Sequence, residues 1–303
     1  MAGTESFPLE TFENWMSVLD NSYVISDFVW TSMDYLGESG IGRMHFDPDT
    51  KEFLGKYPWH QAYCGDIDLA GFKRPQSYYR DVVWGNGNPL YIAVHYPIPE
   101  GKTPIITLWG WPDVDASWNW AGHEGETFKV DVYSAAEKVE LFLNGKSLGE
   151  KPTTRAEKLM AAFDVPYEAG ELKAVGTLPN GQTVSHVLRT TGAPAKIRLS
   201  PDRSSLAADP LSLSFVTVEV VDAAGQMDPT AAQEIRFRVE GEGELAAVGS
   251  GNPVSEERYR GTQRKVFRGR CIAVVKSNGK PGEIHLFAEA DGLKSTEIVI
   301  PVK

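Results

Sequence analysis

The sequence predicts a mainly β protein in which a β/α segment, residues 1–88, precedes two β-sandwich domains, residues 89–191 and 192–303. In the first segment, apolar residues recur with the helical period of 3.6. After it, short runs alternate between apolar and polar residues, and turn-forming residues separate them, which is typical of β-sandwiches. The stretch Gly192-Ala193-Pro194 is suited to a linker where the second sandwich begins.

The first segment alternates strands and helices. A short strand is expected at Gly3–Ser6, and "PLETFENWMSVLD" then spaces its apolar residues three and four apart, as an amphipathic helix does. The β-branched and aromatic run "YVISDFVW" predicts a buried strand. After a long Gly-rich loop, "RPQSYYRDVVWG" predicts a second helix that ends at Gly85. This order of elements indicates β/α units on a parallel sheet.

The two sandwich regions share a pattern of short strands. In residues 89–191, "PLYIAVHYP", "PIITLWGW" and "KVELFLNGKSLG" predict strands, and Asn144-Gly145 and Asn180-Gly181 predict tight hairpin turns. Residues 192–303 repeat the pattern, for example in "SFVTVEVVDAAGQ" and "EIRFRVEGEGELAAVGSG". Neither region shows a helical period, so both are expected to be all-β.

Composition and charge exclude several classes of function. The formal net charge is −11 and the sequence pI is about 5.1. Binding to a phosphate backbone needs clustered Lys and Arg, so no nucleic-acid partner is expected. The one dense basic stretch, Arg258–Arg270, is interpreted as a solvated face of a strand region. No apolar run approaches the roughly 20 residues that cross a bilayer, so no membrane insertion is expected.

The residues that bind metals or form disulfides are sparse. Cys64 and Cys271 lie far apart in the sequence and are interpreted as buried thiols. His45 and His60 have no second histidine at metal-ligand spacing. Neither a metal nor a cofactor is therefore expected.

Carbohydrate-directed residue types occur at the predicted strand ends of the first segment. In a parallel β/α barrel, the active site lies at the C-terminal ends of the strands. Glu5 stands where the first strand is expected to end, and Trp30 where the next one ends. A carboxylate can attack an anomeric carbon, and an indole packs against the apolar C–H face of a sugar. In the following loop, Asp34, Glu38 and Arg43 either bind sugar hydroxyls or cap and bridge the loop.

Four tryptophans in "WGWPDVDASWNW", residues 109–120, allow two interpretations. One is a stacking platform for a glycan. The other is packing between the first sandwich and the β/α segment. The second is favoured, because Trp is bulky and often half-buried at domain contacts.

Three stretches of the first segment resemble a known family: "GTESFPLETFENW", "VISDFVWTSMDYLGESGIG" and "YCGDIDLAGFKRPQSYYRDVVWG". Together they resemble the last two units of the (β/α)₈ barrel of glycoside hydrolase family 2, in particular Bacteroidetes-like β-galactosidases. The stretch "SWNWAGHEGETFKVDVYSAAEKVELFLNGKSLGEK" resembles the sandwich that follows this barrel. Residues 192–303 resemble the C-terminal immunoglobulin-like domain of these enzymes. The resemblance implies that both sandwiches are immunoglobulin-like and that a barrel fragment precedes them.

The resemblance also implies roles for individual residues. Glu5 matches the nucleophile of a retaining mechanism, and Trp30 matches a tryptophan that lines the sugar subsite; Asp34 is a further candidate for substrate binding. The family's general acid/base, a Glu after an Asn at the end of strand four, has no counterpart here, because the resemblance begins at strand seven. Retention needs two carboxyl groups about 5–5.5 Å apart. We therefore expect a portion of a β-galactosidase-like hydrolase of terminal β-galactosides that is inactive alone.

The sequence is compatible with other sugar specificities and with one other class of function. β-Glucuronidase and β-mannosidase belong to the same family, so the sugar and the linkage are undetermined, as is the oligomeric state. The resemblance suggests a periplasmic or secreted parent protein. The rival hypothesis is a non-catalytic carbohydrate-binding or adhesive module built on the two sandwiches.

Overall fold

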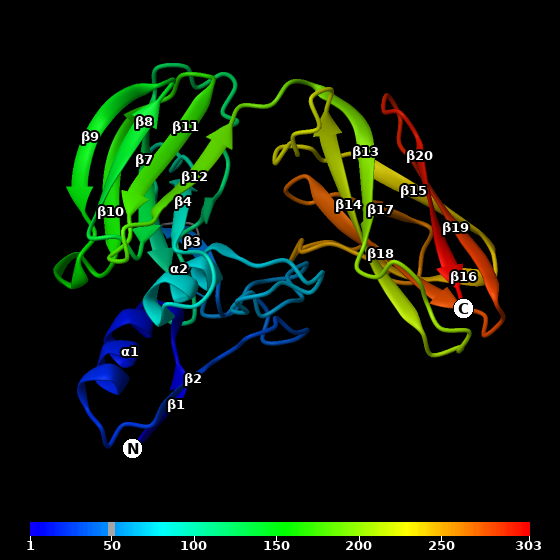
Figure 1. Ribbon diagram of the computed structural model, residues 1–303, viewed down its shortest axis with the longest axis horizontal. Helices are drawn as coiled ribbons and strands as arrows, with labels where there is room; N and C mark the ends of the chain where they lie inside the picture. Colours follow the sequence, from blue (N-terminus) through cyan, green and yellow to red (C-terminus); the bar gives the residue numbers. More distant parts are fainter. Residues whose placement is uncertain (48–51) are drawn as a thin grey trace. The chain divides into compact units, whose positions relative to one another are not determined.

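The computed structural model describes residues 1–47 and 52–303, which form two compact units, Met1–Thr190 and Thr191–Lys303 (Figure 1). The fold is mainly β, as the sequence predicts. Each unit contains two four-stranded sheets. In the described residues, no helix is both long and apolar enough to span a membrane.

The first unit begins with a β-α-β element. Strands β1 (Ala2–Ser6) and β2 (Ser26–Val29) are parallel, and a 3₁₀ turn (Pro8–Glu10) and α1 (Thr11–Asp20) connect them (Figure 1). The predicted parallel β/α order is therefore present. The prediction that "YVISDFVW" forms a buried strand was wrong, since Phe28 is 60% exposed. The described sheet has only these two strands, which leaves β2 largely uncovered.

The predicted second helix is α2 (Pro75–Trp84), which begins with a proline at its first position. Gly85 ends it in the left-handed conformation at φ 66°, a region where a side chain is unfavourable. The helix contacts both α1 and the strands of the first sandwich (Figure 1).

Aromatic side chains attach α2 to that sandwich. The ring of Tyr78 stacks on Tyr91 with centroids 4.1 Å apart, and Tyr79 packs edge-on against Tyr133 at 5.2 Å. The Tyr79 hydroxyl donates to the carbonyl of Lys158 at 2.8 Å. Residues on both sides of position 88 thus share one buried cluster, within the same compact unit.

The first sandwich packs sheet β10-β7-β4-β6 against sheet β12-β11-β8-β9. Its alternation is strict in β8, where Val139, Leu141 and Leu143 point into the core. The Asn144-Gly145 turn joins β8 to β9 as predicted, and Asn180-Gly181 lies between β11 and β12. The bounds are β4 (Leu90–His95), β6 (Val114–Asp115), β7 (Thr127–Ser134), β8 (Lys138–Leu143), β9 (Lys146–Pro152), β10 (Met160–Pro166), β11 (Glu171–Thr177) and β12 (Thr183–Arg189), with a 3₁₀ turn at Arg155–Glu157.

One predicted sandwich strand has a different partner. The run "PIITLWGW" contributes β5 (Thr103–Ile106), which pairs with β3 (Met44–Asp47) from the Gly-rich loop and not with the sandwich sheets. Pairing between segments about 60 residues apart leaves no local signal in the sequence, because it depends on how the loop folds back.

The second unit packs sheet β13-β14-β18-β16 against sheet β17-β15-β19-β20. The run "EIRFRVEGEGELAAVGSG" splits into two strands that belong to different sheets, and the chain turns at Gly241 with φ 86°. The bounds are β13 (Pro194–Pro201), β14 (Leu213–Asp222), β15 (Glu234–Gly241), β16 (Gly243–Gly249), β17 (Gln263–Lys265), β18 (Arg270–Ser277), β19 (Gly282–Glu289) and β20 (Thr296–Val302).

The basic stretch Arg258–Arg270 is not wholly solvated. The side chain of Arg264 is fully buried, and its guanidinium donates to Ser250 Oγ at 3.2 Å and to the Glu257 carbonyl at 3.1 Å. The prediction of a solvated face was therefore wrong for this residue. Both cysteines are buried free thiols, as predicted.

Candidate functional site

The C-terminal ends of β1 and β2 bring Glu5 and Trp30 to one edge of the two-stranded sheet. Ser6 pairs with Val29, and the backbone N–H of Trp30 donates to the Ser6 carbonyl at 3.4 Å. Glu5, which precedes Ser6, is exposed. The two parallel strands therefore place a carboxylate and an indole at neighbouring strand ends, in the arrangement that the sequence predicts.

Trp30 begins a short hydrogen-bonded chain of side chains. The residue is 42% exposed, and its indole Nε1 donates to the Tyr35 hydroxyl at 3.3 Å. The Tyr35 hydroxyl in turn donates to the carboxylate of Glu38. Burial and this hydrogen bond raise the pKa of Tyr35, so the phenol stays protonated. These hydrogen bonds orient the indole, and Trp30 remains partly exposed to solvent.

Asp34, the residue before Tyr35, is buried. Its Oδ1 accepts the backbone N–H groups of Tyr35 at 3.1 Å and Tyr63 at 2.9 Å, and its Oδ2 lies 3.4 Å from the Arg74 guanidinium. Burial raises the pKa of Asp34, against the opposing effect of Arg74. In this structure its oxygens hold the loop together, which matches the loop-bridging alternative for this residue.

Arg43 has the same kind of environment. Its buried guanidinium donates to the carbonyls of Gly40 at 3.1 Å, Phe53 at 2.8 Å and Glu52 at 2.5 Å. Each of these groups belongs to the loop that follows β2. Arg43 therefore bridges loop segments, whereas Glu38 reaches the surface near Trp30.

Two glycines let the loop segments approach each other backbone to backbone. A Cβ atom on Gly65 would lie 2.3 Å from the Asp34 nitrogen, and one on Gly42 would lie 2.3 Å from the Tyr63 carbonyl oxygen. Neither position has room for a side chain. The backbone around Asp34 and Tyr63 is thus closely packed.

Asp66 and Asp68, which lie in the loop before α2, have different roles. Asp68 accepts the backbone N–H groups of Ala70 and Phe72, as a turn residue does. Asp66 instead pairs with Arg80 of α2, with 2.6 Å between Oδ2 and Nε. This buried ion pair connects the loop to the helix and was not foreseen from the sequence.

The four tryptophans of residues 109–120 are packing residues. Trp118 is fully buried, and its Nε1 donates to the Glu168 carbonyl at 2.9 Å. Trp120 packs on Phe128 at 4.8 Å, within the sandwich. Trp109 lies edge-on to Phe7 at 4.3 Å, and Trp111 contacts Tyr79 and Tyr133. The packing interpretation is correct, with the qualification that Trp118 and Trp120 serve the core of the sandwich itself.

Among residues 1–47 and 52–303, no three His, Cys, Asp or Glu side chains gather as they would around a metal ion. The strand-end site presents the carboxylate of Glu5, the indole of Trp30 and the phenol of Tyr35.

Comparisons with known proteins agree with this architecture. Residues 197–299 match the family described as glycoside hydrolase family 2 C-terminal domain 5, and residues 125–185 match a family described as a domain of unknown function. The chain is 34% identical to the beta-galactosidase BoGH2A of Bacteroides ovatus over 292 residues, which is 95% of this chain and 30% of that protein. It is 28% identical to a putative beta-glucuronidase of Formosa agariphila, over 89% of this chain and 23% of that protein.

A crystal structure of a glycosyl hydrolase family 2 member from Bacteroides cellulosilyticus superimposes with a TM-score of 0.91 at 37% identity. The match covers 100% of this chain and 39% of that one. The chain thus spans well under half the length of each of these proteins.

Proposed function

Because the chain belongs to glycoside hydrolase family 2 and corresponds to the C-terminal part of its relatives, we propose that it is part of a retaining β-galactosidase acting on terminal β-galactosides. Glu5 is the proposed nucleophile and Trp30 the proposed sugar-stacking residue. The observation that carries the proposal is the placement of both residues at the ends of adjacent parallel strands. The choice of galactose rests on the Bacteroides ovatus relative, whereas the Formosa agariphila relative has the name of a glucuronidase.

In the proposed reaction, a Glu5 carboxylate oxygen attacks the anomeric carbon and displaces the leaving-group oxygen. A second carboxyl group protonates that oxygen and later activates the water that releases the sugar. Trp30, whose indole is oriented by Tyr35, packs against the sugar ring. The second carboxyl group has no matching position in this sequence, so we propose that residues 1–303 alone do not turn over a substrate.

The first experiment measures turnover of aryl β-galactoside and aryl β-glucuronide by the purified 303-residue chain. We expect no turnover above a Glu5→Gln control. Turnover that Glu5→Gln abolishes would contradict the proposed inactivity but would support Glu5.

The second experiment uses a longer protein, if the genomic reading frame extends upstream of Met1. A 2-deoxy-2-fluoro-β-galactoside forms a slowly hydrolysed glycosyl-enzyme, and we expect mass spectrometry to find the label on Glu5. Labelling of a different carboxylate, or equal labelling in Glu5→Gln, would refute the role of Glu5. Labelling only by the corresponding glucuronide would refute the proposed sugar.

The rival hypothesis of a carbohydrate-binding module does not gain support from the tryptophans. Trp118 has no exposed face on which a sugar could stack. A different surface of the same sandwich is better suited to a glycan, as described next.

A further inference from the structure

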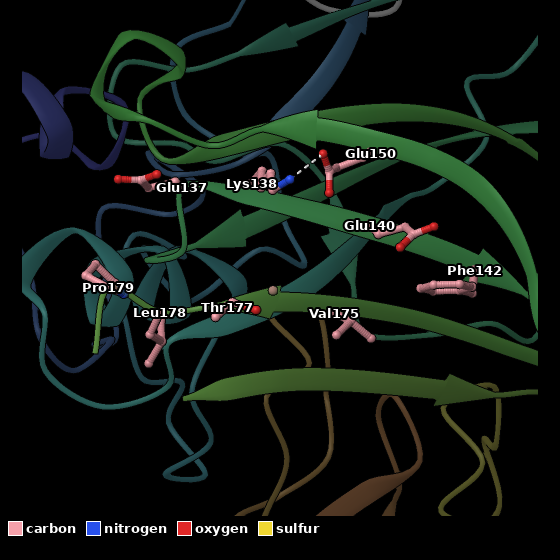
Figure 2. A pocket seen from close by; sticks show the side chains of 10 residues that line it. Glu137, Lys138, Glu140, Phe142, Glu150, Val175, Thr177, Leu178 and Pro179 are labelled. Atoms are coloured by element: carbon pink, nitrogen blue, oxygen red, sulfur yellow. Dashed lines mark hydrogen bonds and ion pairs between the residues drawn. The ribbon is translucent and has the colours of Figure 1, made fainter. Parts of the chain in front are cut away.

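The outer face of the first sandwich carries a groove of about 520 Å³ over strands β8 and β11. This volume is within the range of about 300–1,000 Å³ that is common for small-molecule sites. Figure 2 shows Phe142 and Glu140 towards one end of the groove, Leu178 and Pro179 at the other, and the Lys138–Glu150 ion pair between them. From Lys138 to Phe142 the strand extends roughly 14 Å at about 3.4 Å per residue, a length suited to an oligosaccharide.

Strand alternation explains why a phenylalanine faces outward here. In β8, every second residue fills the core, so Lys138, Glu140 and Phe142 all point to the opposite face. In β11 the same alternation turns Val175 outward, directly opposite Glu140. An aromatic ring and an aliphatic side chain thus lie on a face that the sandwich core does not use.

The polar groups of the groove are mostly carboxylates. Glu137, Glu140 and Glu150 line it together with a single ammonium, that of Lys138. Lys138 pairs with Glu150 at 2.9 Å. Glu140 accepts the Ser147 hydroxyl at 2.6 Å and lies opposite Glu150 in the strand pairing. Two carboxylates facing each other are unfavourable unless a donor lies between or beside them.

The charge of the groove favours neutral ligands over anionic ones. The excess of carboxylates repels phosphates, sulfates and uronates. Neutral hydroxyl groups suit these carboxylates, because a hydroxyl that donates to a carboxylate makes a charge-assisted hydrogen bond. A flat ring flanked by acceptors is the combination that binds the C–H face and the hydroxyl edge of a neutral sugar.

The second sandwich provides a contrast within the same chain. Its outer face also carries a groove, lined in part by Phe287, Arg236 and Arg238. There the guanidinium of Arg238 lies 3.9 Å over the Phe287 ring and covers it. That groove therefore offers a sugar no open ring, and Phe287 is a matched control for Phe142.

We propose that the groove over β8 and β11 is a binding site for a neutral oligosaccharide, with Phe142 as the stacking residue and Glu140 as a hydroxyl acceptor. The site does not depend on Glu5 or on turnover. Through this groove the first sandwich would hold an oligosaccharide at a place separate from the strand-end site.

The test is isothermal titration of the purified 303-residue chain with neutral β-linked galactose and glucose oligosaccharides, and with an oligogalacturonate as the anionic probe. We expect binding of a neutral probe only. Phe142→Leu keeps an apolar side chain but removes the ring, and it should weaken binding at least tenfold, as should Glu140→Gln. Phe287→Leu, at the ring that Arg238 covers, should leave the affinity unchanged.

Several outcomes would overturn the proposal. These are no binding of any neutral probe, preferential binding of the oligogalacturonate, or equal affinity in Phe142→Leu. Loss of binding in Trp30→Ala alone would assign the sugar to the strand-end site. If Phe142→Leu does not fold, chemical-shift perturbation of the Thr177 and Gly176 amides in the parent chain decides, since a ligand in the groove must shift them. A dimer that dissociates on Phe142→Leu, seen by light scattering, would show that a second copy covers the groove.

Discussion

His186 of β12 should make the first unit sensitive to mild acid. Its Nδ1 accepts the backbone N–H of Ile92 at 3.0 Å, and its ring stacks on Tyr91 at a centroid distance of 5.1 Å. Ile92 belongs to the opposite sheet of the sandwich, so this hydrogen bond joins the two sheets. A protonated Nδ1 cannot accept, and burial lowers the pKa of His186 from 6.5 to about 4.

The sign and the size of the effect follow from this pKa. The unfolded chain binds a proton near pH 6.5 that the folded chain binds only near pH 4, so stability is lost as the pH falls through this window. A difference of about 2.5 pKa units corresponds to roughly 3.4 kcal/mol at 1.36 kcal/mol per unit. The ring is partly exposed to solvent, which reduces the expected loss to about 2 kcal/mol.

The assay is urea unfolding of the parent chain and of His186→Gln at pH 7.5, 6.5, 5.5 and 4.5. The Gln oxygen can accept the same N–H without titrating, so the parent should lose about 2 kcal/mol relative to the variant as the pH falls. Other groups that titrate in this window cancel in the difference. His123→Gln, at a partly exposed histidine, controls for the chemical change. A stability difference between the parent and His186→Gln that stays constant across the four pH values would refute the reasoning.

Three further substitutions test other parts of the structure. Trp118→Ala should lower the free energy of unfolding by about 3–5 kcal/mol in urea titrations, because it removes a fully buried indole. Tyr57→Ala, at an exposed residue, is the control and should cost less than about 1 kcal/mol. A loss as small as that in Trp118→Ala would mean that Trp118 is not a core residue. Asp34→Ala should speed proteolytic cleavage between residues 31 and 74, because the N–H of Tyr63 loses its acceptor. The sandwich strands should keep their hydrogen-exchange protection. Unchanged cleavage would contradict the role of Asp34 in holding the loop. Arg264→Ala should destabilise the second unit by about 3 kcal/mol, whereas exposed Arg260→Ala should change its stability by less than about 0.5 kcal/mol in the same assay.

Local patterns were sufficient for the order of elements in the first segment. Pro75 and Gly85 delimit α2 because each favours one end of a helix, and Asn144-Gly145 forms a hairpin because that pair tolerates positive φ. The adjacency of Glu5 and Trp30 also follows from local order, since parallel neighbours have their C-terminal ends on the same side.

Features set by the surroundings could not be predicted in this way. Whether Asp34 faces a sugar or the protein depends on where Tyr63 and Arg74 return in space, about 30 and 40 residues later. Arg264 is basic, but its side chain is buried in the structure, where Ser250 and the Glu257 carbonyl accept hydrogen bonds from its guanidinium. In each case distant partners, which leave no periodic signal, decide the environment.

Phe142 lies in a regular alternating stretch of the sequence. The alternation predicts a strand, but it does not single out Phe142 as a binding residue. Alternation assigns one face to the core and says nothing about the use of the other. The functional question at Phe142 arises only when Val175 and Glu140 are known to lie beside it.

The attachment of α2 to the first sandwich constrains how this gene can recombine. Tyr78 and Tyr79 cover Tyr91 and Tyr133, so a crossover near position 88 would leave aromatic surface uncovered on both products. The helix and the sandwich are therefore expected to be inherited as a pair. A crossover near position 190 separates two units with cores of their own. Exchange of C-terminal domains among relatives should accordingly concentrate at that second junction.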